Sequence, residues 1–332
     1  MKAILMQTLG TPEVLTLADV PAPAIAGETD VLVRLKAAGV NPIDTKLRAR
    51  GTYFPERMPA ILGCDGAGVI EAVGSRVSRF KVGDAVYFCN GGIGGEAGCY
   101  AEVAVVDERF AAHKPERLDF TQAAAAPLVL ITAWEALHDR ARMTAGQTVL
   151  IHAGAGGVGH VAIQLAKNAG CRVITTVSSA EKAEFVRALG ADEVIRYRDT
   201  DFVAATLDLT EGQGADIVFD TVGGATFSAS FAATRPYGDV VTLLQPGADT
   251  DWKTARLRNL RVSQELMLSP MYYGWTDAQQ HQASILEQCA GLFDAGKLRV
   301  HVDRVLPLAQ AAEAHRMIEA GKVIGKLVLA VG

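Results

Sequence analysis

Cysteine is scarce in this chain, and its spacing excludes two kinds of structure. The 332 residues contain five cysteines, no two of them spaced as CxxC. An odd number without that spacing fits neither a disulfide framework nor a zinc ribbon. We therefore expect a protein of the reducing cytoplasm.

Long apolar runs and an excess of positive charge are also lacking. The longest mostly apolar run covers residues 123–134, short of the ~18 residues of a membrane span. The N-terminal sequence MKAILMQTLG reaches Thr8 and Gly10 too early for a signal peptide. The net charge is −5, with Lys and Arg scattered along the chain, which argues against nucleic-acid binding. We expect neither a membrane nor a nucleic acid as partner.

The sequence instead shows two successive patterns of secondary structure. The first 120 residues hold short β-branched runs separated by Gly and Pro, which indicates a strand-rich domain. A buried helix with a Pro interruption follows. From residue 148 apolar strands alternate with amphipathic helices, the pattern of a doubly wound parallel sheet covered on both faces. The expected strands are 148–153, 171–177, 193–197, 216–222, 239–244 and 261–268.

In the C-terminal segment, after about residue 268, the alternation of strands and helices ends. Its last strand, KLVLAV, has no following helix. We therefore expect this segment to complete the first domain. The predicted division is a β-rich domain of residues 1–122 completed by 269–332, with an α/β domain of residues 123–268 between the two parts.

The strongest motif is HAGAGGVGHVAIQL, between an apolar strand and a helix. Gly154, Gly156 and Gly159 form a GxGxxG that includes Gly157 and Val158. The first glycine permits a tight turn, the second allows close approach to a pyrophosphate, and the third packs helix on strand. The motif predicts dinucleotide binding, the alternative being a structural glycine-rich turn.

The end of the next strand indicates the kind of dinucleotide. Ser178 and Ser179 stand where an acidic side chain would bind an NAD ribose, and Lys182 follows one turn later. This favours NADP(H). The alternative is a capping box in which Ser178 caps the helix and Glu181 reaches back, with Lys182 a solvated surface residue.

Several stretches together carry a family likeness. AGAGGVGHVAIQLAKNAG, LGADEVIRYRDTDF, EAHRMIEAGKVIGKLVL, AAGVNPIDTKLRARG and GCDGAGVIEAVG resemble the zinc-independent quinone oxidoreductase branch of the medium-chain dehydrogenase/reductase superfamily. The resemblance implies a GroES-like substrate domain, an inserted Rossmann domain, an active-site cleft between them and a homodimer joined through residues 261–268.

The resemblance also bears on zinc. Zinc alcohol dehydrogenases of that superfamily have a Cys where this chain has Asn41, and a His-Glu pair where it has Cys64 and Asp65. An amide is a poor zinc ligand, so we expect no metal. LGCDGAGVIEAVG is interpreted as a turn linking strands, and Asp44 as a capping residue at least as readily as a catalytic one.

A chain without a Lewis acid needs an acceptor that is already electrophilic. The expected reaction is hydride transfer from NADPH to a quinone or an α,β-unsaturated carbonyl. By resemblance Asn41 lies near nicotinamide and substrate, and the Tyr53 hydroxyl donates to the acceptor oxygen. Further cofactor contacts implied by the resemblance are Thr132, Tyr197, Val222 and Leu243. A zinc alcohol dehydrogenase and a non-catalytic NADPH-binding redox sensor are the alternatives.

Overall fold

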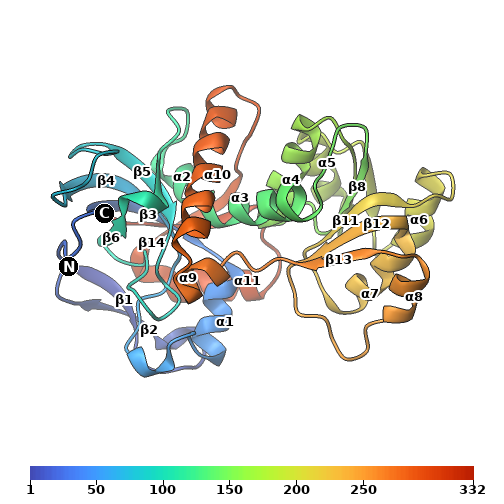
Figure 1. Cartoon of the computed structure of the whole chain (residues 1–332). Coiled ribbons are helices and arrows are strands. Elements are labelled where there is room, and N and C mark those ends of the chain that lie inside the picture. Colours follow the sequence, from blue (N-terminus) through green and yellow to red (C-terminus); the bar gives the residue numbers. More distant parts are fainter. The chain divides into compact units, whose positions relative to one another are not determined.

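A computed structural model describes all residues from Met1 to Gly332 (Figure 1). Contacts divide the chain into two compact units. The first unit comprises Met1–Ile131, Leu268–Gly296 and Val300–Gly332, and the second comprises Thr132–Met267 and Lys297–Arg299. The sequence places the first boundary at residue 122. In the structure the chain passes from one unit to the other within a helix, α3 (Pro127–Trp134).

The first unit is built on a seven-stranded sheet with the order β14-β15-β3-β4-β5-β7, in which β6 also pairs with β3. Its strands are β3 (Asp30–Val40), β4 (Asp65–Val73), β5 (Ala85–Cys89), β6 (Val103–Asp107), β7 (Ala111–His113), β14 (Val302–Pro307) and β15 (Lys326–Ala330). A separate antiparallel pair joins β1 (Lys2–Met6) to β2 (Leu15–Asp19). Strand β15, from the C-terminal segment, pairs with β3, so both ends of the chain build this sheet.

Five helices accompany the strands of the first unit. They are α1 (Pro42–Arg50), α2 (Phe120–Ala124), α9 (Ser269–Tyr273), α10 (Thr276–Asp294) and α11 (Ala311–Glu319). The predicted Pro interruption is present, because α2 ends at Ala124 and Pro127 opens α3. A π-helical turn, Glu135–Arg140, follows α3 directly.

The second unit confirms the predicted doubly wound sheet. Six parallel strands have the order β10-β9-β8-β11-β12-β13. They are β8 (Thr148–Ile151), β9 (Arg172–Val177), β10 (Glu193–Arg196), β11 (Ala215–Asp220), β12 (Thr234–Thr242) and β13 (Arg261–Gln264). The strand order reverses between β8 and β11, the point at which such sheets bind ligands.

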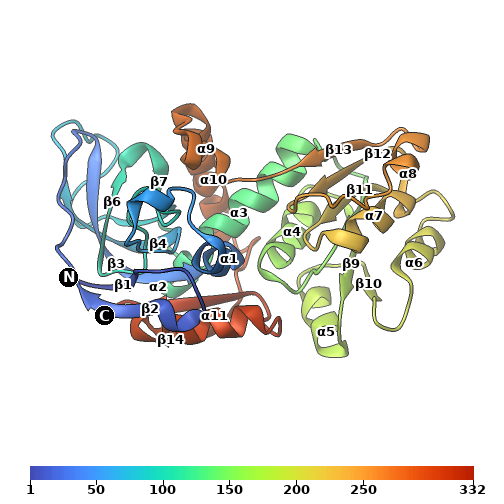
Figure 2. The ribbon, with the colours of Figure 1, turned by 90° about the horizontal axis from the view of Figure 1, so that it is seen from below.

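Helices cover both faces of this parallel sheet. They are α4 (Gly157–Asn168), α5 (Ala180–Ala188), α6 (Phe202–Leu209), α7 (Gly224–Ala233) and α8 (Trp252–Leu257). Figures 1 and 2 show α4 and α5 on one side of the strands and α6 to α8 on the other. A core cluster on the second side combines Leu150, Ile174, Ile195, Val218 and Val240 from five strands with Phe227 and Phe231 of α7. No helix of the structure has both the length and the apolar character that crossing a bilayer requires.

The interpretation of LGCDGAGVIEAVG as a turn is wrong. Residues Asp65–Val73 form strand β4, in the middle of the first sheet. A Cβ on Gly66 would lie 2.7 Å from the Cys99 sulfur, and one on Gly68 would overlap the Arg34 carbonyl. These glycines therefore serve close packing rather than chain reversal. Only Gly63, with φ of 92°, adopts a turn conformation before the strand.

Candidate functional site

Three polar residues meet at one end of three neighbouring strands in the first unit. Asn41 directly follows β3, Asp65 opens β4 and Lys326 opens β15. Because β3 runs antiparallel to both neighbours, with Gly39 opposite Asp65 and Val40 opposite Leu327, the end of β3 coincides with the start of the other two. All three side chains are almost fully buried.

The Asn41 amide bridges the two charges. Its Nδ2 donates to Asp65 Oδ2 over 2.8 Å, and its Oδ1 accepts a hydrogen bond from Lys326 Nζ. Lys326 Nζ also lies 3.6 Å from Asp65 Oδ2. A flipped amide would turn its NH2 toward the ammonium and its oxygen toward the carboxylate, so these charges fix the orientation of Asn41. We call Lys326, Asn41 and Asp65 the charged bridge.

The Asp65 carboxylate is surrounded by donors. Its Oδ1 accepts the backbone N–H of Leu128 over 2.8 Å, in the first turn of α3, where the helix dipole favours a negative charge. Burial raises the pKa of Asp65, while the Lys326 ammonium, the Asn41 amide and the Leu128 N–H act in the opposite direction. Since every one of these partners donates, they stabilise the ionised carboxylate.

The cysteines beside Asp65 do not complete a zinc site. A hydrogen bond with Cys64 and burial raise the pKa of Cys89 well above its usual range, and the pKa of Cys99 is raised by burial. The neighbouring carboxylate, Asp65, already binds an ammonium and two N–H groups. No group of three or more His, Cys, Asp and Glu side chains is arranged to hold a metal ion. The donor set around Cys64 therefore does not fit catalytic zinc, which needs three protein ligands.

A second polar chain runs from the charged bridge toward α11. Asp44 Oδ2 accepts the backbone N–H of Asn41 over 2.8 Å and the Tyr100 hydroxyl over 2.9 Å, and that hydroxyl lies 3.3 Å from His315 Nε2. The contact to the Asn41 N–H is the capping role expected as one alternative for Asp44. Its other oxygen, Oδ1, is buried without a partner. Burial raises the pKa of Asp44 to about 7.

Tyr53 lies in a loop beside an aromatic cluster of the first unit. Its ring centroid is 5.1 Å from that of Tyr272. Burial raises the pKa of Tyr53, with smaller contributions from Cys64 and Tyr272. Its backbone N–H donates to Ile93 over 3.0 Å, and the structure gives its hydroxyl no hydrogen-bond partner. The hydroxyl therefore remains able to donate to a ligand.

The glycine-rich loop in the second unit connects β8 to α4. Gly156 is the N-cap of α4, whose first turn contains Gly157, Val158 and Gly159. The left-handed residue of the turn is Ala153, with φ of 49°, and not Gly154 as the motif predicted. Gly154 is needed for space, because a Cβ there would overlap the Thr175 hydroxyl.

The same loop has room on its outer side. A Cβ on Gly156 would meet only the Ala153 carbonyl, at 3.2 Å, whereas one on Gly159 would overlap that carbonyl and press on Gly154. The helix and strand are thus packed tightly while the N-terminus of α4 stays open. Open N–H groups at a helix N-terminus fit a pyrophosphate.

Buried hydrogen bonds hold the loop from beneath. His152 contacts the Thr176 hydroxyl over 3.1 Å and the Ser230 hydroxyl over 3.0 Å. The N–H groups of Ala153 and Gly154 donate to the side chain and carbonyl of Thr176, respectively. Burial lowers the pKa of His152 to about 4, so the ring is neutral at physiological pH and can both donate and accept.

The ends of β9 and β10 bring the second set of cofactor candidates together. Tyr197 follows β10 and donates its backbone N–H to Val177, the residue before Ser178. The N-cap of α5 is Ser179, whose hydroxyl accepts the Lys182 N–H over 3.3 Å. The alternative in which Ser178 caps this helix is therefore wrong. Tyr197 is exposed and Lys182 partly exposed.

The remaining candidates lie at the end of β11, at the end of β12 and in α3. The buried carboxylate of Asp220 accepts the N–H of Val222 over 3.0 Å and the hydroxyl of Thr242 over 2.7 Å. The Asp220 carbonyl accepts the N–H of Leu243 over 3.1 Å. Asp220 thus fixes Val222 and Leu243 to each other. Thr132 is buried in α3.

Sequence reasoning missed Asp220, Tyr100 and His315, and it placed Lys326 near the cleft without assigning it a role. Asp220 carried a signal, since an Asp ends the apolar strand just before two glycines. Lys326 carried a weaker one, a lysine heading the apolar strand KLVLAV. Tyr100 and His315 carried none, because their contacts join residues 215 positions apart.

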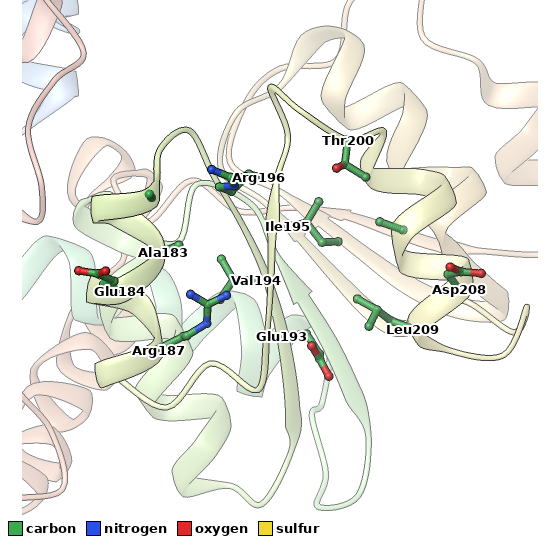
Figure 3. Close-up of a pocket in the computed structure, with 12 residues that line it drawn as sticks. Ala183, Glu184, Arg187, Glu193, Val194, Ile195, Arg196, Thr200, Asp208 and Leu209 are labelled. Atoms are coloured by element: carbon green, nitrogen blue, oxygen red, sulfur yellow. The ribbon is translucent and has the colours of Figure 1, made fainter.

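A separate pocket of about 650 Å³ lies at the outer edge of the parallel sheet. Figure 3 shows it between α5 and α6, with β10 as its floor. Charged side chains of both signs line it, among them Glu184, Arg187, Glu193, Arg196 and Asp208. None of the cofactor candidates lines this pocket, so it is distinct from the glycine-rich loop.

Comparison with known proteins agrees with this geometry. Residues 27–116 match the family model described as alcohol dehydrogenase GroES-like domain, and residues 189–329 match that described as zinc-binding dehydrogenase. A quinone oxidoreductase of Pseudomonas aeruginosa is 36% identical over 328 residues, covering 99% of each chain.

Two solved structures extend the likeness to the whole fold. An alcohol dehydrogenase superfamily protein from Novosphingobium aromaticivorans has a TM-score of 0.92 and 37% identity, covering 100% of both chains. An Escherichia coli quinone oxidoreductase solved with NADPH has a TM-score of 0.86 and 28% identity, covering 99% of this chain and 100% of that one.

The strand-rich unit and the glycine-rich Rossmann unit define an oxidoreductase of the medium-chain dehydrogenase/reductase superfamily. Within that superfamily the chain belongs to the quinone oxidoreductase branch.

The charged bridge yields a stability prediction. Replacing Lys326→Met leaves the Asp65 carboxylate buried without its cation, which costs about 3 to 5 kcal/mol of unfolding free energy. Adding Asp65→Asn removes the orphaned charge, so the double variant should be more stable than the single one. Urea unfolding followed by circular dichroism measures both. The exposed Lys322→Met is the matched control and should change stability by less than about 0.5 kcal/mol. Equal losses in the single and double variants would contradict an ionised bridge.

Asp44 yields a pH prediction. Its folded-state pKa of about 7 lies well above the ordinary value of an aspartate, 3.8, so its contribution to stability is complete below pH 4 and is lost as the pH rises toward 7. Between pH 5 and pH 8 the wild-type chain should lose about 2 to 3 kcal/mol that Asp44→Asn does not lose, at about 1.4 kcal/mol per pKa unit. Asparagine keeps an acceptor for the Asn41 N–H. Urea midpoints at the two pH values test this, and parallel profiles of the two proteins would refute it.

Proposed function

We propose that this chain is a zinc-independent, NADPH-dependent reductase of quinones or α,β-unsaturated carbonyls. One observation carries the proposal: the Lys326 ammonium binds the Asn41 oxygen and lies against Asp65, so the polar groups beside Cys64 already have a cation. A site without a metal needs an acceptor that is electrophilic by itself. Quinones and enones meet that condition. The curated relative from Pseudomonas aeruginosa, named a quinone oxidoreductase, supports the same acceptor class.

The second unit would hold NADP(H). Gly156 to Gly159 and the N-terminus of α4 suit the pyrophosphate, with Val222, Leu243, Thr132 and Asn41 as further contacts. At the end of β9, Ser178 and Ser179 carry no negative charge to repel a 2′-phosphate. Lys182 follows in the first turn of α5, and the exposed Arg198 follows Tyr197 in sequence. The Escherichia coli relative was solved with NADPH, which supports this choice.

The side chains of the first unit would bind and orient the acceptor. When bound, the nicotinamide supplies the hydride. The Tyr53 hydroxyl donates a hydrogen bond to the acceptor oxygen as that oxygen gains charge. Asn41 is held in one orientation by Lys326 and Asp65, and its role is to maintain the shape of the site. No side chain near Asn41 is assigned as proton donor, and water supplies the proton.

We further infer a cytoplasmic homodimer. All five cysteines are free and buried, which suits a reducing compartment. Strand β13 ends the parallel sheet, and such an edge can pair with the same strand of a second copy.

The experiment is an acceptor screen that follows NADPH absorbance for the wild-type chain and for Lys182→Ala. The wild-type chain should oxidise NADPH in the presence of quinones or enones. Lys182→Ala should raise the KM for NADPH about tenfold, because a charge-assisted contact to phosphate contributes about 1.5 kcal/mol. The KM for NADH, which lacks the 2′-phosphate, should stay within about twofold.

Lys253→Ala removes an exposed lysine of the same unit and is the control for charge. Equal effects of Lys182→Ala on both cofactors would overturn the NADPH assignment. Clear NADPH binding without oxidation by any quinone, enal or enone would overturn the acceptor class.

A further inference from the structure

An aromatic cluster covers the surface next to Tyr53. Tyr272 is its central ring, with centroids 5.1 Å from Tyr53, 5.5 Å from Phe54 and 4.6 Å from Tyr273. Trp275 stacks on Tyr273 at 4.9 Å with an angle of 15° between the rings. We call these five residues the aromatic ladder.

The ladder is exposed although its members are large and apolar. Tyr272, Tyr273 and Trp275 are 36%, 62% and 54% exposed, respectively. An exposed contiguous aromatic surface is unusual enough to indicate a binding function. The ladder begins at Tyr53, whose hydroxyl is without a partner. Its continuity with Tyr53 points to a small molecule that also reaches this hydroxyl.

The first unit holds the ladder in place. Tyr272 donates its backbone N–H to Leu268 over 3.0 Å within α9. Gly274, with φ of 69°, turns the chain from α9 into α10, and the Trp275 N–H donates to Pro270 over 2.9 Å. Helix α10 is fixed to the sheet below, where the Tyr87 hydroxyl donates to the Leu286 carbonyl over 2.5 Å. Tyr272 and Tyr273 are therefore presented by the short helix α9, and Trp275 by the N-cap of α10.

The rings around Tyr272 are tilted rather than stacked. Tyr272 meets Tyr53 at 42° and Phe54 at 52°, so these rings are not stacked on one another. A planar ring can still gain offset or edge-to-face contact with Tyr272, an interaction that aromatic pairs make at 4.5 to 7 Å. In an acceptor, a second ring beyond the reacting carbonyl would make this contact with Tyr272.

We propose that Tyr272 determines acceptor specificity by binding a second aromatic ring while the reacting carbonyl meets Tyr53. This rests on the proposed reductase function and refines it. The chain thus prefers fused-ring acceptors over one-ring acceptors of the same reactive group. The preference belongs to Tyr272 and lies mainly in KM.

The test compares 1,4-naphthoquinone with 1,4-benzoquinone in the wild-type chain, Tyr272→Ala and Tyr272→Phe. Tyr272→Ala should raise the KM for the two-ring quinone about three- to tenfold, with kcat and the KM for the one-ring quinone within about twofold. Tyr272→Phe keeps the ring and should retain the wild-type preference. The intrinsic reactivities of the two quinones cancel, because each variant is compared with wild type on the same pair.

Leu257→Ala is the matched control, since it removes an exposed apolar side chain of the second unit. It should leave both KM values unchanged. Titration of tryptophan fluorescence with each quinone measures binding without turnover, and the loss of two-ring preference in Tyr272→Ala should appear there as well.

The outcomes separate the two proposals. Turnover of both quinones with equal KM changes in Tyr272→Ala would overturn the role of Tyr272 and leave the reductase function standing. Absence of turnover together with a Tyr272-dependent preference in binding would overturn the reductase function and support the aromatic subsite. Absence of both would overturn both.

Discussion

A buried ammonium that binds a carboxylate through an amide organises the first unit. Lys326, Asn41 and Asp65 come from three adjacent strands and are nearly inaccessible to solvent. Each charge is costly alone in this environment, and each becomes acceptable because the other is present. The pair orients the Asn41 amide, and the Leu128 N–H ties Asp65 to the start of α3. The C-terminal strand, the inner sheet and the helix that leads into the second unit therefore meet at one interaction.

The second unit depends on an arrangement of a different kind. Its glycine-rich loop is shaped by steric constraints rather than by charge. Ala153 adopts a left-handed conformation, Gly156 has free space on its outer side, and Gly159 packs closely against the strand. Neutral His152 and Thr176 hold that geometry from beneath. Asp220 likewise holds the backbone in place at the ends of β11 and β12, where it accepts hydrogen bonds from the Val222 N–H and the Thr242 hydroxyl. These polar side chains thus hold the backbone at the edge of the sheet in place and leave the N-terminus of α4 open.

The fold could be predicted where a pattern is local. The six strands of the second unit and the glycine-rich loop follow from apolar runs and glycine spacing within about twenty residues. Glycines misled the prediction where their reason was not local. Gly66 and Gly68 suggested a turn, although they lie in a strand because Cys99 and Arg34, distant in sequence, leave no room for a Cβ. The cap of α5 was misplaced by one residue, a difference that depends on backbone angles at Ser179.

The candidate site was harder to predict because its contacts are long-range. Asn41 was recognised, but its partner Lys326 lies 285 residues away. A single lysine before an apolar strand has no neighbour in sequence that indicates burial. The contacts of Tyr272 with Tyr53 and Phe54 could not be predicted either, because more than 200 residues separate these rings in the sequence.

We propose that Lys326 supplies the cation beside Cys64 and Asp65 and that turnover needs no metal. The most direct test is metal analysis of chain purified without chelator, combined with NADPH-dependent quinone reduction before and after dialysis against a zinc chelator. Zinc should be found far below one atom per chain, and turnover should be unchanged by the dialysis. About one zinc per chain, with activity lost on its removal, would contradict it.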